Sequence, residues 1–174
     1  MFVALTVALL IASPVMAAVE VAVAPQAGYH VYSNDSLENS LGAGVQVSIK
    51  DVFVDNLVVF SGLEFVSTDF ATSLNSLDQV VWSNGVGYSL AGILGVANLD
   101  VVPFVSGDAY FTSSDTLSVE NTYGFSVGTT ASYAVKDNVS VFATVKYSSA
   151  DADSSIGNID LDNVGLVAGV SIKL

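Results

Sequence analysis

The chain has 174 residues, of which 52% are hydrophobic and only 12% are charged, and its formal net charge is −13. It contains four lysines and no arginine, which excludes binding to the phosphate backbone of a nucleic acid, since that needs clustered basic side chains. The absence of cysteine excludes disulfide scaffolds, zinc–thiolate sites and cysteine nucleophiles.

The first predicted element is a secretory signal peptide over residues 1–17, followed by a mature domain over residues 18–174. An apolar core covers residues 2–12, Pro14 ends it, and small residues follow at the expected cleavage site. The alternative is an uncleaved helical anchor, which Pro14 and Glu20 disfavour. An exported chain without cysteine and with acidic segments is typical of a bacterial envelope protein.

The mature chain repeats one pattern, in which every second residue of a stretch is apolar, as expected for a strand with two different faces. Long, acidic connections at 33–40, 67–79, 113–121 and 151–162 alternate with short ones at 50–56, 97–100 and 136–138. Eight strands are therefore predicted, at 20–32, 41–50, 56–67, 82–96, 101–112, 122–135, 139–149 and 163–174. Most have the length of about 9–11 residues or more that a tilted strand needs to cross a bilayer.

The two faces of these strands differ in composition. One face is apolar, as at Val45 and Val141, whereas the other carries mainly Gly, Ser and Ala rather than charged residues. Small residues fit the crowded inside of a narrow barrel, and solvated sheet faces usually carry charge. We therefore predict an all-β fold, an eight-stranded antiparallel up-and-down transmembrane β-barrel, because only a closed barrel lets strands cross lipid without unpaired backbone groups. A soluble lipocalin-like barrel is the alternative.

Alternation does not decide which side chains of the third and fifth strands point outward. Ser61 and Gly107 fall on the nominal outer face, and Phe60 and Phe104 fall on the nominal inner face. A β-bulge would shift this parity.

Aromatic side chains mark one level of the predicted outer face. Aromatic residues are common in strands, but gathering at one level favours an interfacial girdle. Tyr133 is the clearest member of a thinner girdle at the opposite level. The members of the main girdle lie at the strand ends nearest the long connections and are Tyr29, Phe65, Trp82, Phe111, Tyr123 and Tyr147.

Three stretches resemble the small eight-stranded outer-membrane barrels of the OmpA/OmpX type. They are the hairpin YAVKDNVSVFATVKYS (133–148), the glycine-rich GAGVQVSI (42–49) and the ending VGLVAGVSIKL (164–174), where Leu174 replaces the Phe that usually ends this family. The resemblance covers the mature chain. It implies localisation in the bacterial outer membrane, insertion by the barrel-assembly machinery, both termini in the periplasm and four acidic loops outside.

A few ionisable residues fall on the predicted inner face. Glu64, Asp108 and Lys146 each lie about seven or eight residues from the periplasmic end of their strand, so they are expected to meet at one level. Because buried charges need partners, we expect an interior ion-pair network, which the family resemblance also suggests. The network is expected to be structural, with gating of a narrow water path as the alternative.

His30 is the only histidine, and it lies near the outer end of the first strand. Ser and Asp are plentiful in the loops, but no motif marks a nucleophile. We therefore expect no enzymatic activity and no cofactor, and we interpret His30 as an inner or rim histidine.

The long connections are acidic and carry no cation, whereas Lys50, Lys136 and Lys173 lie at the other end. Such a rim meets the phosphates of lipopolysaccharide only through divalent cations. Asp151, Asp153 and Asp162 have the spacing of a calcium loop and form a candidate metal site. Ile156 stands where that motif has Gly, and the alternative is a solvated acidic rim.

The sequence thus predicts a structural or surface-interaction role in the bacterial envelope. A narrow low-conductance channel and an adhesin acting through the acidic loops are the alternatives. The expected partners are outer-membrane lipid, lipopolysaccharide and the barrel-assembly machinery, and the expected oligomeric state is a monomer.

Overall fold

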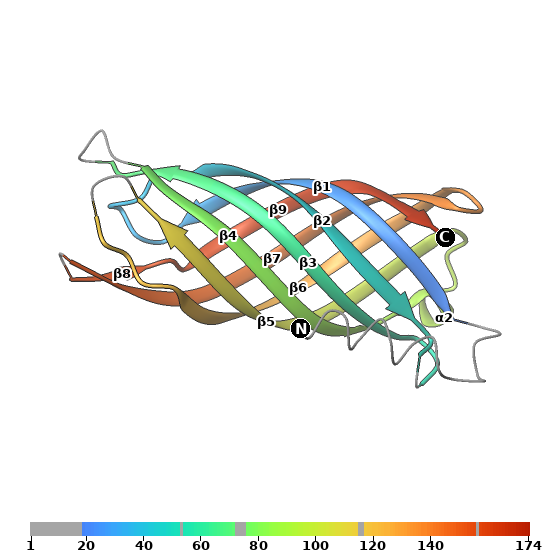
Figure 1. Cartoon of the computed structure of the whole chain (residues 1–174). Helices are drawn as coiled ribbons and strands as arrows, with labels where there is room; N and C mark the ends of the chain where they lie inside the picture. The colour runs from blue at the N-terminus through green and yellow to red at the C-terminus, as the bar shows by residue number, and fades with distance from the viewer. Residues whose placement is uncertain (1–18, 53, 72–75, 115–116, 156) are drawn as a thin grey trace.

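Nine strands and one short helix make up the described chain (Figure 1). The computed structural model describes residues 19–174 except 53, 72–75, 115–116 and 156, so the predicted signal peptide (1–17) lies outside the described residues. Among the residues that the structure describes, no helix has the length and apolar character needed to span a bilayer. The elements are β1 (Glu20–Tyr32), β2 (Ser40–Lys50), β3 (Leu57–Asp69), β4 (Ser76–Tyr88), α2 (Ala91–Leu94), β5 (Leu99–Ser113), β6 (Thr122–Lys136), β7 (Val139–Ser154), β8 (Gly157–Asp160) and β9 (Asn163–Lys173).

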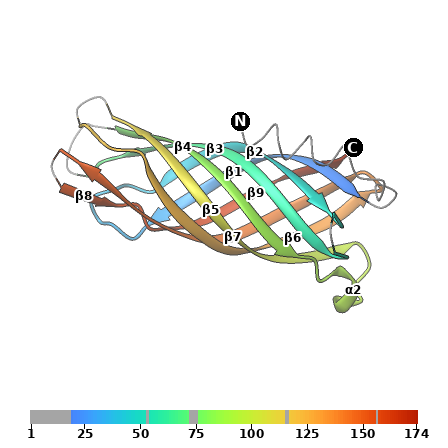
Figure 2. The same ribbon diagram turned by 60° about the horizontal axis from the view of Figure 1, so that its bottom comes forward.

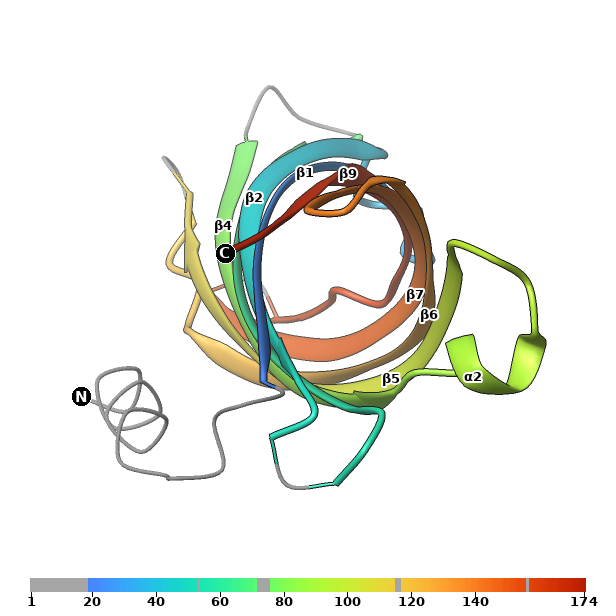
Figure 3. The same ribbon diagram turned by 90° about the vertical axis from the view of Figure 1, so that its right-hand side faces the viewer.

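Backbone pairing closes the sheet into a barrel. The hydrogen-bonded order is β6-β5-β4-β3-β2-β1-β9-β7, and a further pairing between β6 and β7 joins the two ends. All of these pairs are antiparallel. Figure 3, which looks along the barrel from the end that holds the C-terminus, shows the strands as a ring. The predicted fold, an eight-stranded antiparallel β-barrel, is confirmed.

The strand β7 continues beyond the ring and pairs with β8 in a hairpin, from Asp151↔Asp160 to Ser154↔Gly157. On the other side of β7, the amide of Glu120 donates a hydrogen bond to the carbonyl of Asp153 at 2.8 Å. The connection predicted at 151–162 is therefore mostly strand. Asp, Asn and Gly are depleted in strands, which is why the sequence predicted a loop here.

The fourth strand differs from its prediction at both ends. It begins at Ser76 rather than at residue 82, because β3 and β4 stay paired as far as Asp69↔Ser76. It ends at Tyr88 rather than at residue 96, and the helix α2 follows. Leu90, with φ of −98° and ψ of 7°, has already left the extended conformation, and further along Gly95 and Asn98 are left-handed, with φ of 63° and 66°. The apolar alternation beyond Tyr88 therefore belongs to a connection.

The side chains of the ring strands face as predicted, with apolar residues outside. Val45 and Val141 are 42% and 46% exposed on the outer surface. The alternate positions, such as Gly42 and Ser148, are buried toward the lumen. Because the outer surface is apolar and the backbone is paired all the way round, the barrel is suited to hydrocarbon as its solvent.

The facing of the third and fifth strands is settled without a bulge. The pairings β3–β4 and β4–β5 keep one register throughout, and Phe60 and Phe104 face the lumen. Ser61 lies on the outer face, where its hydroxyl accepts a hydrogen bond from Nε1 of Trp82 at 3.1 Å. A register shift does occur between β6 and β7, at Ala134/Lys136.

Candidate functional site

Three phenylalanine side chains line the lumen, and each lies opposite a glycine on the neighbouring strand. The pairs are Phe60↔Gly85, Phe104↔Gly128 and Phe142↔Gly169. A Cβ atom at Gly85 would lie 2.3 Å from Cζ of Phe60, and the other two glycines would be similarly crowded by their phenylalanines. The rings of Phe60 and Phe104 also meet edge to face, with centroids 5.3 Å apart. The glycines of the inner face therefore make room for the rings.

A polar cluster crosses the lumen near its middle. Oε2 of Glu64 on β3 lies 2.9 Å from Nζ of Lys146 on β7, and Oε1 lies 2.9 Å from Nε2 of His30 on β1. The other ring nitrogen of His30 lies 3.2 Å from Oδ1 of Asn163, whose amide nitrogen donates to the carbonyl of Leu161. Glu64 is only 4% exposed, so two basic side chains hold a buried carboxylate. We call Glu64, Lys146 and His30 the lumen triad.

Glycines also accommodate the lumen triad. A Cβ atom at Gly28 or at Gly42 would come within 2.9 Å of Oε1 of Glu64, and Gly165 lies directly opposite Lys146. The carboxylate is held by two partners and is not free to move aside. The lumen triad can therefore form only if residues without a side chain occupy these positions.

The expected three-residue network needs a correction at Asp108. The structure brings Glu64 and Lys146 together, but Asp108 accepts its hydrogen bonds from the hydroxyls of Ser106, at 3.1 Å, and Ser126. Ser126 in turn bonds the hydroxyl of Ser148 at 2.8 Å. Asp108 is thus satisfied by neutral hydroxyl groups on its own and neighbouring strands, and His30 takes the place in the triad that was expected for Asp108.

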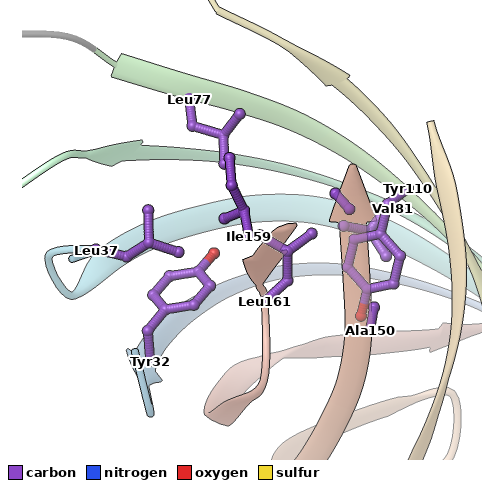
Figure 4. Close-up of a cluster of buried hydrophobic side chains, with 9 residues drawn as sticks. Tyr32, Leu37, Leu77, Val81, Tyr110, Ala150, Ile159 and Leu161 are labelled. Carbon is purple, nitrogen blue, oxygen red and sulfur yellow. The ribbon is translucent and has the colours of Figure 1, made fainter. Parts of the chain in front are cut away.

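An apolar plug fills the end of the lumen that carries the long connections (Figure 4). Leu77 and Leu161 are fully buried in it, and Ile159 projects into it from the β7–β8 hairpin. The plug was not predicted from the sequence, because part of it comes from segments that were predicted to be polar loops. Its members are Tyr32, Leu37, Leu77, Val81, Tyr110, Ala150, Ala152, Ile159 and Leu161.

The other end of the lumen, which holds both termini of the barrel, contains a cavity of about 170 Å³. Its walls combine polar side chains with alanine, valine and phenylalanine, and it reaches up to Glu64 and Lys146. At its mouth, Nζ of Lys50 lies 3.1 Å from Oδ2 of Asp100, and Ser89 donates to the same carboxylate at 2.7 Å. The lumen is thus open at one end and filled at the other.

The candidate metal site at Asp151, Asp153 and Asp162 is not supported. Within the described ranges of the chain, no group of three or more His, Asp or Glu side chains is placed to hold a metal ion. Oδ2 of Asp162 instead accepts a hydrogen bond from the hydroxyl of Tyr147 at 2.5 Å, and Oδ1 accepts one from the amide of Ala150 at 3.1 Å. Ile156 lies outside the described residues.

Hydrogen bonds to the carboxylate of Asp162 lower its pKa. Burial by itself raises the pKa of this carboxyl, but hydrogen bonds from Tyr147, Ser149 and the Ala150 amide outweigh burial and bring the pKa below its ordinary value. Asp162 therefore stays ionised as a structural anchor between the hairpin and β9.

Comparison with known proteins gives structural neighbours but no sequence relatives. No family model and no curated protein matches the chain. A major outer membrane protein of Thermus thermophilus is similar at a TM-score of 0.63 and 16% identity, covering 88% of this chain and 99% of that one. OprG of Pseudomonas aeruginosa gives 0.65 and 10%, covering 90% and 95%. Neisserial surface protein A gives 0.64 and 13%, covering 90% and 97%.

The chain has the fold of the small bacterial outer-membrane β-barrels. The neighbours are themselves bacterial outer-membrane proteins, which agrees with the localisation predicted from the sequence. In such barrels the short connections are periplasmic and the long loops are extracellular. The plugged end of this barrel therefore corresponds to the extracellular side, and the cavity opens to the periplasm.

The predicted girdle residues lie on the outside of this barrel. Tyr29, Phe65, Phe111, Tyr123 and Tyr147 are exposed there, and Trp82 is half-buried against Ser61. At the periplasmic end, Tyr133 is also exposed, and so is Tyr88, which was not among the predicted girdle residues. Both sets suit the boundary between hydrocarbon and headgroups, where an amphipathic ring has its apolar body in lipid and its hydroxyl in water.

Proposed function

We propose that this outer-membrane barrel has a structural or surface-interaction role in the bacterial envelope and is not an open pore. The observation that carries the proposal is the filling of the lumen at two successive levels. The lumen triad crosses the middle, and the apolar plug occupies the extracellular end. Water and ions entering from the periplasmic cavity meet first a paired carboxylate and then a layer of fully buried leucine side chains.

Two measurements test this proposal on the purified full chain. A shift in gel mobility between boiled and unboiled samples reports the folded barrel. Planar bilayer recordings of the same preparation are expected to be silent, with a large porin in the same membrane as the positive control for detection. Discrete conductance steps from heat-modifiable protein would support the alternative of a narrow channel and overturn the structural role.

A surface-interaction role is supported by the β7–β8 hairpin, which extends beyond the ring (Figure 1). Its residues Asp151 and Asp153 have exposed side chains, in keeping with the anionic rim expected from the sequence. This rim contacts lipopolysaccharide phosphates through divalent cations, and the barrel works as a monomer. The test is binding of lipopolysaccharide with and without a chelator, for the natural chain and for the double variant Asp151→Asn/Asp153→Asn. Binding that is the same in all four cases would contradict this role.

We propose no catalytic role. His30 is buried, and both of its ring nitrogens are engaged, with Glu64 and Asn163. A general base needs a nitrogen within reach of a nucleophile. Hydrolysis of ester, amide or phospholipid substrates that is lost in His30→Gln but retained by the natural chain would contradict the proposal.

A further inference from the structure

The connection between β4 and β5 carries an apolar surface that no part of the ring covers. Residues 89–99 have the sequence SLAGILGVANL and contain no charged side chain. Ile93 is 74% exposed, and Leu94 and Val96 are also exposed. In a periplasmic turn, such residues would face water unless something apolar lies against them. We call residues 90–97 the β4–β5 segment.

Hydrogen bonds at both ends of the β4–β5 segment fix its position relative to the barrel. The carboxylate of Asp100 accepts a hydrogen bond from the Ala91 amide at 3.2 Å, and the Leu90 amide donates to the carbonyl of Val101 at 2.9 Å. At the other end, the Ala134 amide of β6 donates to the carbonyl of Asn98 at 2.8 Å. These bonds fix the segment to the rim of the barrel on both sides.

The helix α2 of this segment lies to the side of the barrel mouth (Figure 3). Figures 2 and 3 show α2 outside the ring of strands, beside the periplasmic rim. The hollow at the mouth is lined by Ala91, Gly92 and Val96, and Ile93 and Leu94 do not line it. The helix α2, which carries Ile93 and Leu94, therefore lies on the side of the rim where the membrane surrounds the barrel (Figure 3).

The β4–β5 segment is continuous with the lipid-facing surface of the barrel. Tyr88 lies two residues before the segment, and Tyr133 pairs with Leu99, two residues after it. Both tyrosines are exposed on the outer face at the periplasmic interface, as is the neighbouring Val135. An uncharged apolar segment at this depth meets the boundary between headgroups and acyl chains of the adjoining leaflet.

We propose that the β4–β5 segment is a membrane-interface anchor that inserts Ile93 and Leu94 into the periplasmic leaflet of the outer membrane. The neighbouring turn between β2 and β3 gives a matched comparison. Val54 in that turn is 62% exposed, but Asp51 and Asp55 lie beside it. Charged neighbours keep that turn in water, so the two turns at the same end of the barrel have different environments.

The test uses the absence of cysteine from the chain. Ile93→Cys and Val54→Cys each give one thiol for a polarity-sensitive fluorophore, in full-length protein refolded into phosphatidylcholine vesicles. Heat-modifiable gel mobility first selects folded barrels, and failure at that step is a failure of folding, separate from the anchor. Leu94→Cys replaces Ile93→Cys if the latter does not fold.

The label at position 93 is expected to emit at shorter wavelength than the label at 54, to resist quenching by aqueous iodide and to be quenched by bromine carried on the lipid chains. Equal quenching of both labels by iodide would overturn the anchor. Shielding at 93 that grows with the ratio of protein to lipid would also overturn it, since a second copy would then cover the segment. Shielding that is found only in native membranes would overturn it in favour of a periplasmic protein.

Discussion

Lys146 on β7 and Glu64 on β3 meet across the lumen, with Nζ and Oε2 2.9 Å apart, although they are 82 positions apart in the chain. Neither strand neighbours the other in the sheet. The contact therefore ties opposite walls of the barrel together. His30 on β1 bonds the same carboxylate, so the side chain of Glu64 links three strands.

Replacing Lys146 with Met is expected to destabilise the barrel by about 3 kcal/mol, because it leaves Glu64 buried with His30 as its remaining basic partner. The measurement is urea unfolding in lipid vesicles, together with the temperature at which the gel band loses its folded mobility. The control is Lys173→Met: Lys173 and its partner Glu20 are 44% and 38% exposed, so this change is expected to cost less than about 1 kcal/mol. Unchanged heat resistance of Lys146→Met would show that the triad does not stabilise the barrel.

Adding one methyl group at Gly85 is expected to cost about 1–3 kcal/mol. The new Cβ would lie 2.3 Å from the Phe60 ring and 2.6 Å from the carbonyl oxygen of Val105, so the ring and the strand must both shift. Gly62→Ala is the matched control, since its Cβ would have its nearest neighbour at 3.5 Å, an ordinary contact. Urea midpoints of the two variants give the comparison, and equal midpoints would contradict the packing of Phe60 on Gly85.

Strand alternation was sufficient to predict the ring and, outside the third and fifth strands, the facing of its residues. A period of two places His30, Glu64 and Lys146 on one face, because successive side chains of a strand point to opposite sides. The same rule failed beyond Tyr88, where Leu90, Leu94 and Val96 also recur at even spacing. Backbone conformation, which alternation does not report, ends the strand there: Leu90 has a ψ of 7°, and α2 begins at the next residue.

The partners within the lumen depend on geometry that spacing along single strands does not contain. Glu64 reaches His30 past β2, because Gly42 and Gly28 leave space for it. Asp108 accepts a hydrogen bond from Ser126 on the adjacent strand and, among the described residues, is not paired with a cation. A signal was available for the large side chains: Phe60, Phe104, Phe142 and Lys146 each have a glycine opposite them in the neighbouring strand. That pattern can be recognised only once the register is known.

The stability contributed by Asp162 is expected to depend on pH. Its pKa in the folded barrel lies below the ordinary value of 3.8, so its contribution is complete above that pH and is lost as pH falls through the lower folded value. Asp162→Asn should therefore destabilise the barrel by about 1 kcal/mol at neutral pH and progressively less in acid. Urea unfolding at a series of pH values measures the difference. Asp153→Asn, an exposed carboxylate of the same hairpin, is the control and should leave the profile unchanged.

Shortening Leu161 in the apolar plug is expected to cost about 2–5 kcal/mol, because its fully buried side chain leaves a cavity that the barrel walls cannot close. Leu166→Ala, on the lipid-facing side of β9, is the control: lipid chains fill the space that its side chain leaves, so the loss is smaller. Urea midpoints in vesicles compare the two.

The plug also holds the β7–β8 hairpin through Ile159, so Leu161→Ala should make that hairpin more sensitive to added protease, whereas Leu166→Ala should not. Equal costs for both leucines, with equal protease resistance, would mean that the extracellular end of the lumen is not packed as a core. In the bilayer recordings, Leu161→Ala should remain silent, because the lumen triad still crosses the barrel below the plug.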